Sequence, residues 1–465
     1  MDPRSLKFIA AACQGERLGG SPDALAINVC SDSRQAQAGD LFFALAGERF
    51  DAHEFLAEVS RKGVAGMVVE RSRMPAGLPV DGVIVVDNTR QALGRLAAAY
   101  RSDFDLPVIA VGGSNGKTST KELLSAVLKQ KFKTLSSEAS FNNDIGVPTT
   151  LLRLEKSHQV AVLEVGTNHP GELAPLVGMI QPKFGVITSI GREHLEFFRN
   201  LQGVVEEEGW LAELLPRDGK LFVNGDGEWD VQIARRTRAS VARVGLSAGN
   251  DWRLKDLKTD LNGVDFQIDA KNKSVAGEYR INLLGRHQAL NAVFAVAVGA
   301  ELGLSKAEIQ RGLFECKPAK MRLQPMNWNG ICVLNDAYNA NADSMLAALE
   351  TLQEIPCAGR RVAVLGDMAE LGAQSAMAHE EVGRKTAESG VHQLFAVGKM
   401  AAVLAGAARG AGMLGVGEFS DVAKTADALK LFLKAGDVVL LKASRAMRLE
   451  RLVELLQSPA ATEKV

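Results

Sequence analysis

The sequence predicts an α/β protein of three domains, each built on a sheet with helices packed against it. Three observations support this prediction. The chain has 465 residues, a length expected for two or three domains. Short apolar runs alternate with helical patterns along most of the chain, which is typical of parallel sheets covered by helices. A glycine-rich loop separates one such run from one such helix. The predicted domains span residues 1–88, 89–316 and 317–465.

Composition and charge favour an ordinary globular protein with no general affinity for nucleic acid or anionic membranes. Hydrophobic residues make up 46% of the chain, charged residues 23%, and the formal net charge is -1. The five cysteines are scattered without a C-x-x-C pair, as expected for free thiols in a reducing compartment. No signal-peptide pattern opens the chain, and polar residues interrupt the Ala-rich residues 289–304. We therefore expect a cytoplasmic protein without a membrane span.

Residues 1–88 should form a small α/β domain. Apolar runs at residues 66–70 and 83–87 predict short strands, and polar loops lie between the elements without a visible catalytic cluster. Ser33 and Arg34 occupy one of these loops, where they could bind a carboxylate or a phosphate. A solvated turn explains both residues equally well, so the residues alone leave the two alternatives open.

The central segment opens with a predicted helix at residues 89–103 and then contains the most informative stretch of the chain. Residues 108–111 predict a buried parallel strand, and the apolar residues after 119 fall on one face of a helix. Between them lies Gly113-Ser-Asn-Gly-Lys-Thr118. The glycines allow backbone N–H groups to approach phosphate oxygens, the lysine reaches outer phosphates, and the threonine hydroxyl can bind magnesium. These features predict a P-loop ATPase-like domain with a parallel sheet.

The loop departs from the usual G-x-x-x-x-G-K-[ST] pattern at one position, because Val111 stands where the first glycine is expected. An incidental glycine turn is the alternative, but the flanking strand and helix lie as phosphate binding requires. The candidate phosphate-binding residues are Gly113, Ser114, Asn115, Gly116, Lys117, Thr118 and Ser119.

Four further residues of the central segment carry polar groups suited to a ligand. Asn142 and Asn143 lie in a Gly/Pro loop, where they suit either turn geometry or hydrogen bonds to a polar ligand. Glu164 lies in an apolar strand, where its carboxylate needs a partner; magnesium and a structural salt bridge are the alternatives. His194 follows a third strand, at residues 184–190, on the edge where parallel sheets carry their sites. It is a candidate ligand or acid–base group, or a structural histidine.

The remaining segments complete the predicted architecture. Residues 250–282 alternate like antiparallel strands, and the Ala-rich helix that follows should be buried. Asn291, near the start of that helix, could approach a nucleotide, although a capped core helix explains it nearly as well. Beyond residue 317, strands and helices alternate again, which predicts a C-terminal Rossmann-like domain of dinucleotide-binding topology. The chain has no G-x-G-x-x-G motif, so we do not infer NAD.

The chain resembles the Mur ligases, and among them the F-type enzymes, over nearly its whole length. The phosphate loop, Glu164 and His194 match the superfamily, whereas Tyr338-Asn-Ala-Asn341 and Gly366-Asp-Met-Ala-Glu-Leu-Gly372 point to the F-type. The other matching segments are Asp32-Ser-Arg34, Gly39-Asp-Leu-Phe42, Gly47-Glu-Arg49, Asn142-Asn-Asp-Ile-Gly-Val-Pro148, His194-Leu-Glu196, Leu284-Gly-Arg-His287 with Asn291, Asp336-Ala-Tyr338 and Lys442-Ala-Ser-Arg445. Two departures are small: Ala342 stands where the family usually has Pro, and Ala443 where it commonly has Gly.

The resemblance implies an ATP-dependent amide ligase that uses Mg2+. ATP would phosphorylate the free carboxylate of UDP-N-acetylmuramoyl-tripeptide, and the amine of D-alanyl-D-alanine would attack the resulting acyl phosphate. The C-terminal domain would close on the reacting groups and keep water out. We expect a monomer. Because diaminopimelate and lysine versions of the enzyme share these motifs, the third residue of the tripeptide stays open.

The same resemblance carries roles over to single positions. The catalytic residues would be Lys117, which holds the β- and γ-phosphates, with Asn143, Glu164 and His194. The magnesium ligands would include Thr118, Glu164 and His194. The residues closing on the adenosine would be Asn291, Arg322 and Asp336. The substrate-binding residues would be Ser33, Arg34, Asn142, Tyr338, Asn339, Lys442, Ser444 and Arg445.

Two other interpretations stay open at this level. A folylpolyglutamate synthase uses the same ATP chemistry, but its phosphate loop lies much nearer the N-terminus than Gly113 does here. A nucleotide-binding regulatory or scaffold protein could keep the fold without turnover. The presence of Lys117, Thr118, Glu164 and His194 argues against that second interpretation.

The acidic run Glu206-Glu-Glu208 is the largest departure from the family. Mur ligases commonly have Lys-x-Lys-Gly here, and a lysine in this region commonly carries a carbamate that helps hold magnesium. Position 208 lies on the apolar stripe of a predicted helix, and we expect Glu206 and Glu207 to be solvated. The apolar stripe comprises Leu201, Val204, Val205, Leu211 and Leu215. We therefore predict that Glu208 supplies the missing carboxylate to the metal, directly or through water.

Overall fold

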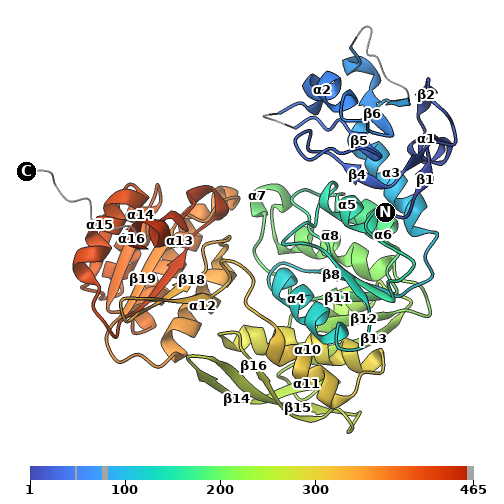
Figure 1. The fold of residues 1–465 in the computed structure, drawn as a ribbon. Helices are drawn as coiled ribbons and strands as arrows, with labels where there is room; N and C mark the ends of the chain where they lie inside the picture. Colours follow the sequence, from blue (N-terminus) through green and yellow to red (C-terminus); the bar gives the residue numbers. More distant parts are fainter. Residues whose placement is uncertain (48–49, 76–81, 458–465) are drawn as a thin grey trace, which may run out of the picture.

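The computed structural model describes residues 1–47, 50–75 and 82–457, so Glu48 and Arg49 of the Gly47-Glu-Arg49 motif lie outside the described residues. Within that part of the chain, larger sheets of five, nine and six strands lie in residues 16–86, 108–281 and 324–442. We call them the N-terminal, central and C-terminal sheets (Figure 1). The predicted α/β class and three-domain architecture are confirmed. Each sheet lies inside one predicted domain, and the boundaries themselves stay predictions.

The N-terminal sheet has the strand order β2-β7-β6-β5-β4, with β2 antiparallel at one edge and the others parallel. Successive residues of its strands face opposite sides, so Phe43 packs against α1 and α3 while Phe42 packs against α2. The elements are β1 (Arg4–Ser5), α1 (Leu6–Cys13), β2 (Glu16–Leu18), β3 (Leu25–Ala26), β4 (Asn28–Cys30), β5 (Asp40–Phe43), η1 (Ala52–Phe55), α2 (Leu56–Ser60), β6 (Gly66–Glu70), η2 (Arg71–Arg73) and β7 (Val83–Val86).

The central sheet has the order β16-β15-β14-β13-β12-β11-β8-β10-β9, parallel except for the antiparallel hairpins of β14, β15 and β16. Helices α4, α10 and α11 cover one face, and α3, α5, α6 and α8 cover the other. The elements are α3 (Thr89–Arg101), β8 (Val108–Gly112), α4 (Lys117–Leu128), β9 (Thr134–Ser136), α5 (Gly146–Leu151), β10 (Val160–Glu164), α6 (Leu173–Ile180), β11 (Phe184–Ile187), α7 (Leu195–Phe198), α8 (Leu201–Glu213), β12 (Lys220–Asn224), α9 (Asp230–Ala234), β13 (Ser240–Gly245), β14 (Trp252–Asp260), β15 (Gly263–Ala270), β16 (Gly277–Ile281), α10 (Arg286–Glu301) and α11 (Lys306–Glu315). The predicted antiparallel strands and the buried Ala-rich helix α10 are confirmed.

The C-terminal sheet has the order β17-β18-β22-β19-β20-β21 and is parallel apart from the edge strand β17. Helices α12, α13 and α14 cover one face, and α15 and α16 cover the other, as the prediction of a Rossmann-like domain requires. The elements are β17 (Gln324–Trp328), β18 (Ile331–Asn335), α12 (Ala342–Glu354), β19 (Arg361–Gly366), η3 (Gly372–Gln374), α13 (Ser375–Glu388), β20 (Gln393–Val397), α14 (Ala401–Gly410), β21 (Val416–Phe419), α15 (Val422–Phe432), β22 (Val438–Lys442), η4 (Arg445–Met447) and α16 (Arg451–Gln457).

Two local predictions were wrong. Strand β11 ends at Ile187, three residues before the predicted end, because Thr188 and Ser189 instead bond to the phosphate loop. Glu207 is buried, not solvated, because its carboxylate accepts hydrogen bonds from the N–H groups of Gly171 (2.8 Å) and Leu173 (2.7 Å) at the start of α6. A helix start leaves such N–H groups without intrahelical partners, and a carboxylate suits them.

No helix in residues 1–47, 50–75 or 82–457 combines the length and the apolar character that crossing a bilayer requires.

The buried hydroxyl of Tyr100 ties α3 to two distant segments. It accepts a hydrogen bond from the Asp2 N–H (2.7 Å) and donates one to the Leu154 carbonyl (2.6 Å). Tyr100→Phe leaves both groups unpaired, which should cost roughly 1–3 kcal/mol in the free energy of unfolding. Calorimetry should show a lower melting temperature. Tyr279→Phe is the control and should lose less, because the Tyr279 hydroxyl bonds only the Val275 carbonyl among the described residues. An unchanged melting temperature in Tyr100→Phe would contradict the prediction.

Candidate active site

A cavity of about 1240 Å³ lies between the central and C-terminal sheets and extends along α3 and α6. The phosphate loop, the loops after β10 and β11, the start of α10 and the loop after β18 line it. Its volume exceeds the roughly 300–1,000 Å³ of an ordinary small-molecule pocket. The cavity therefore has room for more than one ligand.

The phosphate loop joins β8 to α4 and depends on two glycines. Gly113 and Gly116 have φ angles of 107° and 89°, a region that favours glycine. A Cβ atom at 113 would lie 2.6 Å from the Thr188 Oγ1 atom, and one at 116 would lie 2.6 Å from the Asn291 Oδ1 atom. No side chain caps the start of α4 in the described residues. Its first N–H groups are therefore available to an anion.

The end of β11 holds the loop in shape. The Ser114 N–H donates to the Ser189 carbonyl (2.8 Å), and the Asn115 N–H donates to the Ser189 hydroxyl (3.0 Å). The Thr188 hydroxyl donates to the Asn115 carbonyl (2.6 Å). The loop is thus organised before a ligand arrives, which lowers the cost of binding one.

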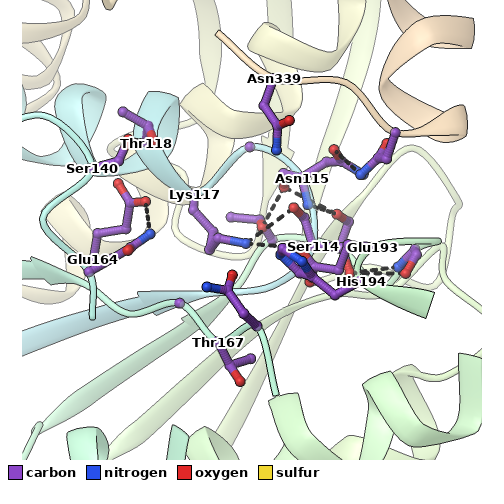
Figure 2. Close-up of a pocket in the computed structure, with 18 of the residues that line it drawn as sticks. Ser114, Asn115, Lys117, Thr118, Ser140, Glu164, Thr167, Glu193, His194 and Asn339 are labelled. Atoms are coloured by element: carbon purple, nitrogen blue, oxygen red, sulfur yellow. Dashed lines mark hydrogen bonds and ion pairs between the residues drawn. The ribbon is translucent and has the colours of Figure 1, made fainter. Parts of the chain in front are cut away.

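Lys117 points into the loop and toward carboxylates (Figure 2). Its Nζ donates to the carbonyls of Gly113 and Ser114 and lies 3.2 Å from the Glu193 Oε2 atom. Burial alone would lower the pKa of Lys117. Three neighbouring carboxylates outweigh that effect, so this pKa lies above its ordinary value and the lysine is charged.

These carboxylates belong to Glu164, Glu193 and Glu208. Each is buried, and each has one oxygen without a hydrogen-bond partner among the described residues. Glu193 and Glu164 line the cavity. Glu208 lies beneath the loop, outside that lining, where its Oε2 accepts from the Gly113 N–H (2.7 Å). Burial raises the pKa of Glu208 above its ordinary value, against the opposing effect of Lys117.

The surroundings of Glu164 fit a magnesium ion bound together with phosphates. Its Oε1 accepts from the Asn142 side-chain amide (2.8 Å), while its Oε2 is the buried, unpartnered oxygen. The hydroxyls of Thr118 and Ser140 lie 3.2 Å apart nearby (Figure 2). The described residues bring no three His, Cys, Asp or Glu side chains together as a metal cluster. Magnesium does not need one, because it usually keeps waters and binds one or two carboxylates plus phosphate oxygens.

A second group of side chains faces the loop from the C-terminal domain. The carboxylate of Asp336 pairs with the Lys442 Nζ (2.5 Å) and accepts from the Leu323 N–H (3.0 Å). Lys442 also donates to the Asn339 carbonyl (3.0 Å). The Arg322 guanidinium lies 4.2 Å from the centre of the Tyr338 ring, a cation–π contact.

The start of α10, residues 287–291, contributes uncharged side chains to this group, and we call it the hinge. Burial lowers the pKa of His287 to about 4, so its imidazole is neutral near neutral pH. The side-chain amide of Asn291 donates to the Gln288 side-chain oxygen (3.1 Å). Asn291 also lies against Gly116, which brings the hinge to the phosphate loop.

Arg192, which follows the end of β11, connects the central and C-terminal domains. Its Nε donates to the Asp343 Oδ1 (2.8 Å), and its Nη1 donates to the Glu381 Oε2 (2.5 Å). The Asn341 side-chain amide donates to the Asn115 side-chain oxygen (3.1 Å) in the phosphate loop. We call these contacts, made by Arg192 and Asn115 with Asp343, Glu381 and Asn341, the interdomain clamp.

His194 takes part in another interdomain contact. Its Nδ1 atom lies 2.5 Å from the Glu370 Oε2 atom. This contact lowers the pKa of Glu370 below its ordinary value. Both residues have positive φ angles, 48° for His194 and 60° for Glu370, so both loops turn sharply to bring the side chains together.

The cavity gathers most of the sequence-predicted site residues. Those that line it are Ser114, Asn115, Gly116, Lys117, Thr118, Ser119, Asn142, Asn143, Glu164, His194, Asn291, Arg322, Asp336, Tyr338, Asn339 and Lys442. Those that do not line it in the described part of the chain are Ser33, Arg34, Gly113, Glu208, Ser444 and Arg445. Their predicted roles stay predictions.

Local contacts occupy several of these predicted residues. Arg34 is exposed and pairs with the Asp32 carboxylate (2.7 Å). The Ser33 carbonyl accepts from the Lys62 Nζ (2.6 Å). The Asn143 Oδ1 accepts from the Gly146 N–H (2.9 Å) at the start of α5.

Sequence reasoning missed several residues that meet at the site. Glu193 stands beside His194, and that neighbourhood was the only signal for it. The roles of Arg192 and Glu370 depend on partners that are distant in the sequence, so no local pattern predicts them. Arg192 and its partner Asp343, for example, are 151 positions apart. Arg90 and Arg95 of α3 also line the cavity. From sequence alone, an arginine on a helix surface is ordinarily predicted to be solvated.

A model of the Mur ligase middle domain matches residues 111–299, and a model of the Mur ligase glutamate ligase domain matches residues 321–445. The UDP-N-acetylmuramoyl-tripeptide–D-alanyl-D-alanine ligase of Bacillus subtilis is 34% identical over 463 residues, covering 99% of this chain and 100% of that protein. The Escherichia coli enzyme of the same name is 37% identical over 438 residues, which cover 92% of this chain and 93% of that protein.

Solved structures show the same similarity. A crystal structure of MurF from Acinetobacter baumannii has a TM-score of 0.88 and 31% identity, covering 98% of this chain and 99% of that one. A structure of UDP-N-acetylmuramoylalanyl-D-glutamyl-2,6-diaminopimelate–D-alanyl-D-alanyl ligase from the same organism has a TM-score of 0.84 and 31% identity. The match covers 98% of this chain and 98% of that one. MurF ligase from Thermotoga maritima in complex with ADP has a TM-score of 0.80 and 27% identity, covering 92% and 96%.

The interdomain clamp should hold the C-terminal domain near the phosphate loop. Arg192→Ala removes charged hydrogen bonds to two carboxylates, worth roughly 1.5–3 kcal/mol when buried and less at this partly exposed site. We expect small-angle scattering of the unliganded protein to show a larger radius of gyration. Arg384→Ala is the control, since Arg384 lies on α13, the helix that carries Glu381, but pairs with Glu380 of its own helix. An unchanged radius in Arg192→Ala would contradict the assignment.

Proposed function

Because the chain belongs to the Mur ligase family, we propose that it is the ATP-dependent ligase that joins D-alanyl-D-alanine to UDP-N-acetylmuramoyl-tripeptide in peptidoglycan synthesis. One observation carries the proposal. The relatives that bear this name are similar over nearly the whole chain, and all the residues expected to bind ATP except Gly113 line one cavity here. We place the reaction in the cytoplasm and expect a monomer.

The proposed reaction has two steps. A carboxylate oxygen of the tripeptide attacks the γ-phosphorus of ATP, and the bond between that phosphorus and ADP breaks to give an acyl phosphate and ADP. The amine nitrogen of D-alanyl-D-alanine then attacks the acyl carbon, and a tetrahedral intermediate forms. The amine loses a proton, phosphate leaves with the electrons of the C–O bond, and an amide remains.

Lys117 and the start of α4 supply positive charge to the phosphates. Lys117 is engaged by the loop carbonyls of Gly113 and Ser114 and by Glu193. Phosphate oxygens must replace these partners, so ATP binding is an exchange of ion pairs in a buried site. Asn291, Arg322 and Asp336 are then assigned to the adenosine, as the resemblance implies, and all three line the cavity.

The donor set around Glu164 supports a magnesium site, since a buried and unpartnered carboxylate oxygen needs a cation or a donor. Thr118 and Glu164 would hold one Mg2+, and His194 and Glu208 would serve a second. When bound, Mg2+ would neutralise phosphate charge and favour attack on the γ-phosphorus. Asn142 would orient Glu164 through its 2.8 Å hydrogen bond, and Asn143 would keep that loop in shape.

The two organic substrates would enter from opposite sides. The N-terminal domain, with Ser33 and Arg34, is assigned to the uridine nucleotide. The C-terminal domain is assigned to D-alanyl-D-alanine through Tyr338, Asn339 and Lys442, and through Ser444 and Arg445 behind them. Domain closure would exclude water, which otherwise hydrolyses the acyl phosphate.

Lys117→Ala should abolish ATP-dependent ligation, because the positive charge of Lys117 is needed at the phosphates. We expect ADP release to fall by about 10²-fold or more. Lys129→Ala, at the exposed C-terminal end of α4, is the matched control and should retain normal turnover. Near-normal ADP release by Lys117→Ala would refute the assignment of the phosphate loop.

The proposed role of Glu208 as a magnesium ligand in place of a lysine carbamate can be tested. If Glu208 supplies its carboxylate to the metal site, ligation should be indifferent to removal of bicarbonate. Glu208→Ala should raise the magnesium concentration required for half-maximal rate and lower kcat together, by about tenfold each. Glu206→Ala changes an exposed glutamate two positions earlier in α8 and serves as the control. Strong stimulation of the wild-type enzyme by bicarbonate would show that the carboxylate comes from elsewhere.

A further inference from the structure

Helix α3 presents two different faces. One face, including Leu93, Leu96 and Tyr100, is buried in the core that joins the N-terminal and central sheets. The other face lines the cavity at positions spaced by one, four, five and eight residues, as one side of a helix requires. Its cavity-lining residues are Arg90, Gln91, Gly94, Arg95 and Ala98. This face therefore combines two small residues, Gly94 and Ala98, with two arginines.

Helix α6 forms the opposite wall of this part of the cavity. Pro175, Leu176 and Met179 of α6 are among the residues that line it. The two helices approach closely, since a Cβ atom at Gly94 would lie 2.9 Å from the Met179 Cε atom. We call the space between them the α3–α6 groove. Its floor is apolar, and its α3 edge is cationic.

The two arginines of the groove form only weak interactions with other side chains of the protein. Arg90 lies 3.5 Å from the Asp144 carboxylate, and both side chains are about half exposed, so this pair is worth little and exchanges readily. Arg95 donates from Nη1 to the neutral Gln14 side-chain oxygen (3.0 Å). Its Nε is buried and has no hydrogen-bond partner in the described part of the chain. A buried guanidinium donor without a partner is costly, which favours an anionic ligand.

The groove also lies where a peptide would pass. Helix α3 starts directly after β7 of the N-terminal sheet, and β8 and the phosphate loop follow it in the chain (Figure 1). A substrate with its uridine in the N-terminal domain and its reacting carboxylate at Lys117 must span this helix. The substrate named for one Acinetobacter relative contains a glutamyl residue. Within a peptide, such a residue keeps one free carboxylate.

We propose that the α3–α6 groove binds the peptide of the UDP-linked substrate, and that Arg90 and Arg95 bind its non-reacting carboxylate. The inference rests on the proposed function. The guanidinium group matches a carboxylate through two parallel N–H···O bonds, and the apolar floor suits the alkyl parts of the peptide. Neither arginine touches the reacting atoms, so both are specificity residues.

Calorimetric binding of UDP-N-acetylmuramoyl-tripeptide without ATP tests this directly. Arg90→Ala and Arg95→Ala should each weaken binding by roughly 5- to 100-fold, the range expected for a charged hydrogen bond. The KM for ATP should change by less than about twofold. Arg95→Lys keeps the charge and should recover part of the affinity. Arg217→Ala, an exposed arginine of the central domain that does not line the cavity, is the matched control.

A second ligand separates this inference from the proposed function. The same tripeptide with its free glutamyl carboxylate amidated should bind the wild-type protein as weakly as the intact peptide binds Arg95→Ala. It should lose little further affinity in that variant. Equal affinity of the wild-type protein for both peptides, or unchanged tripeptide binding in both arginine variants, would overturn the inference and leave the proposed function standing. A wild-type protein that binds neither peptide would overturn both.

Discussion

The ion pairing of Lys117 is the constraint on which the rest of the site depends. The buried Lys117 faces the buried carboxylates of Glu164 and Glu193, with Glu208 beneath the loop, so acidic groups outnumber the one lysine. A triphosphate adds more negative charge to the same place, and buried charges of one sign repel strongly. The start of α4, Lys117 and divalent cations must together offset it. This balance explains why phosphate loop, acidic strand end and metal-binding oxygens converge on one cavity, and why ATP should enter with its metal.

Domain position and site assembly share the same residues. Asn115 belongs to the phosphate loop and also bonds Asn341 of the C-terminal domain. Arg192 and His194, on either side of Glu193, both contact the C-terminal domain. A movement of that domain therefore alters the loop that positions Glu193 against Lys117. In an enzyme that must protect an acyl phosphate from water, such sharing couples closure to catalysis through direct contacts.

The sequence correctly predicted the features that are determined by local residue patterns. The apolar strand, the glycines and the helix face around Lys117 determine β8 and α4, and the alternation of strands and helices determines the Rossmann-like C-terminal domain. The sequence did not predict contacts between segments that are far apart in the chain. Glu207 lies off the apolar stripe of α8 and was expected in solvent, yet the start of α6 covers it. Arg192 finds its partner 151 positions away, and α3 turns a polar face toward a cavity instead of solvent.

In the proposed reaction, ATP phosphorylates a carboxylate of the tripeptide before the amide forms. Isotope transfer tests it most directly. UDP-N-acetylmuramoyl-tripeptide with oxygen-18 in both oxygens of its reacting carboxylate is incubated with ATP, Mg2+, D-alanyl-D-alanine and the enzyme, and the released phosphate is examined by mass spectrometry. We expect one labelled oxygen in each phosphate, carried over when the acyl phosphate collapses to the amide. Phosphate without label, released as the amide forms, would contradict it.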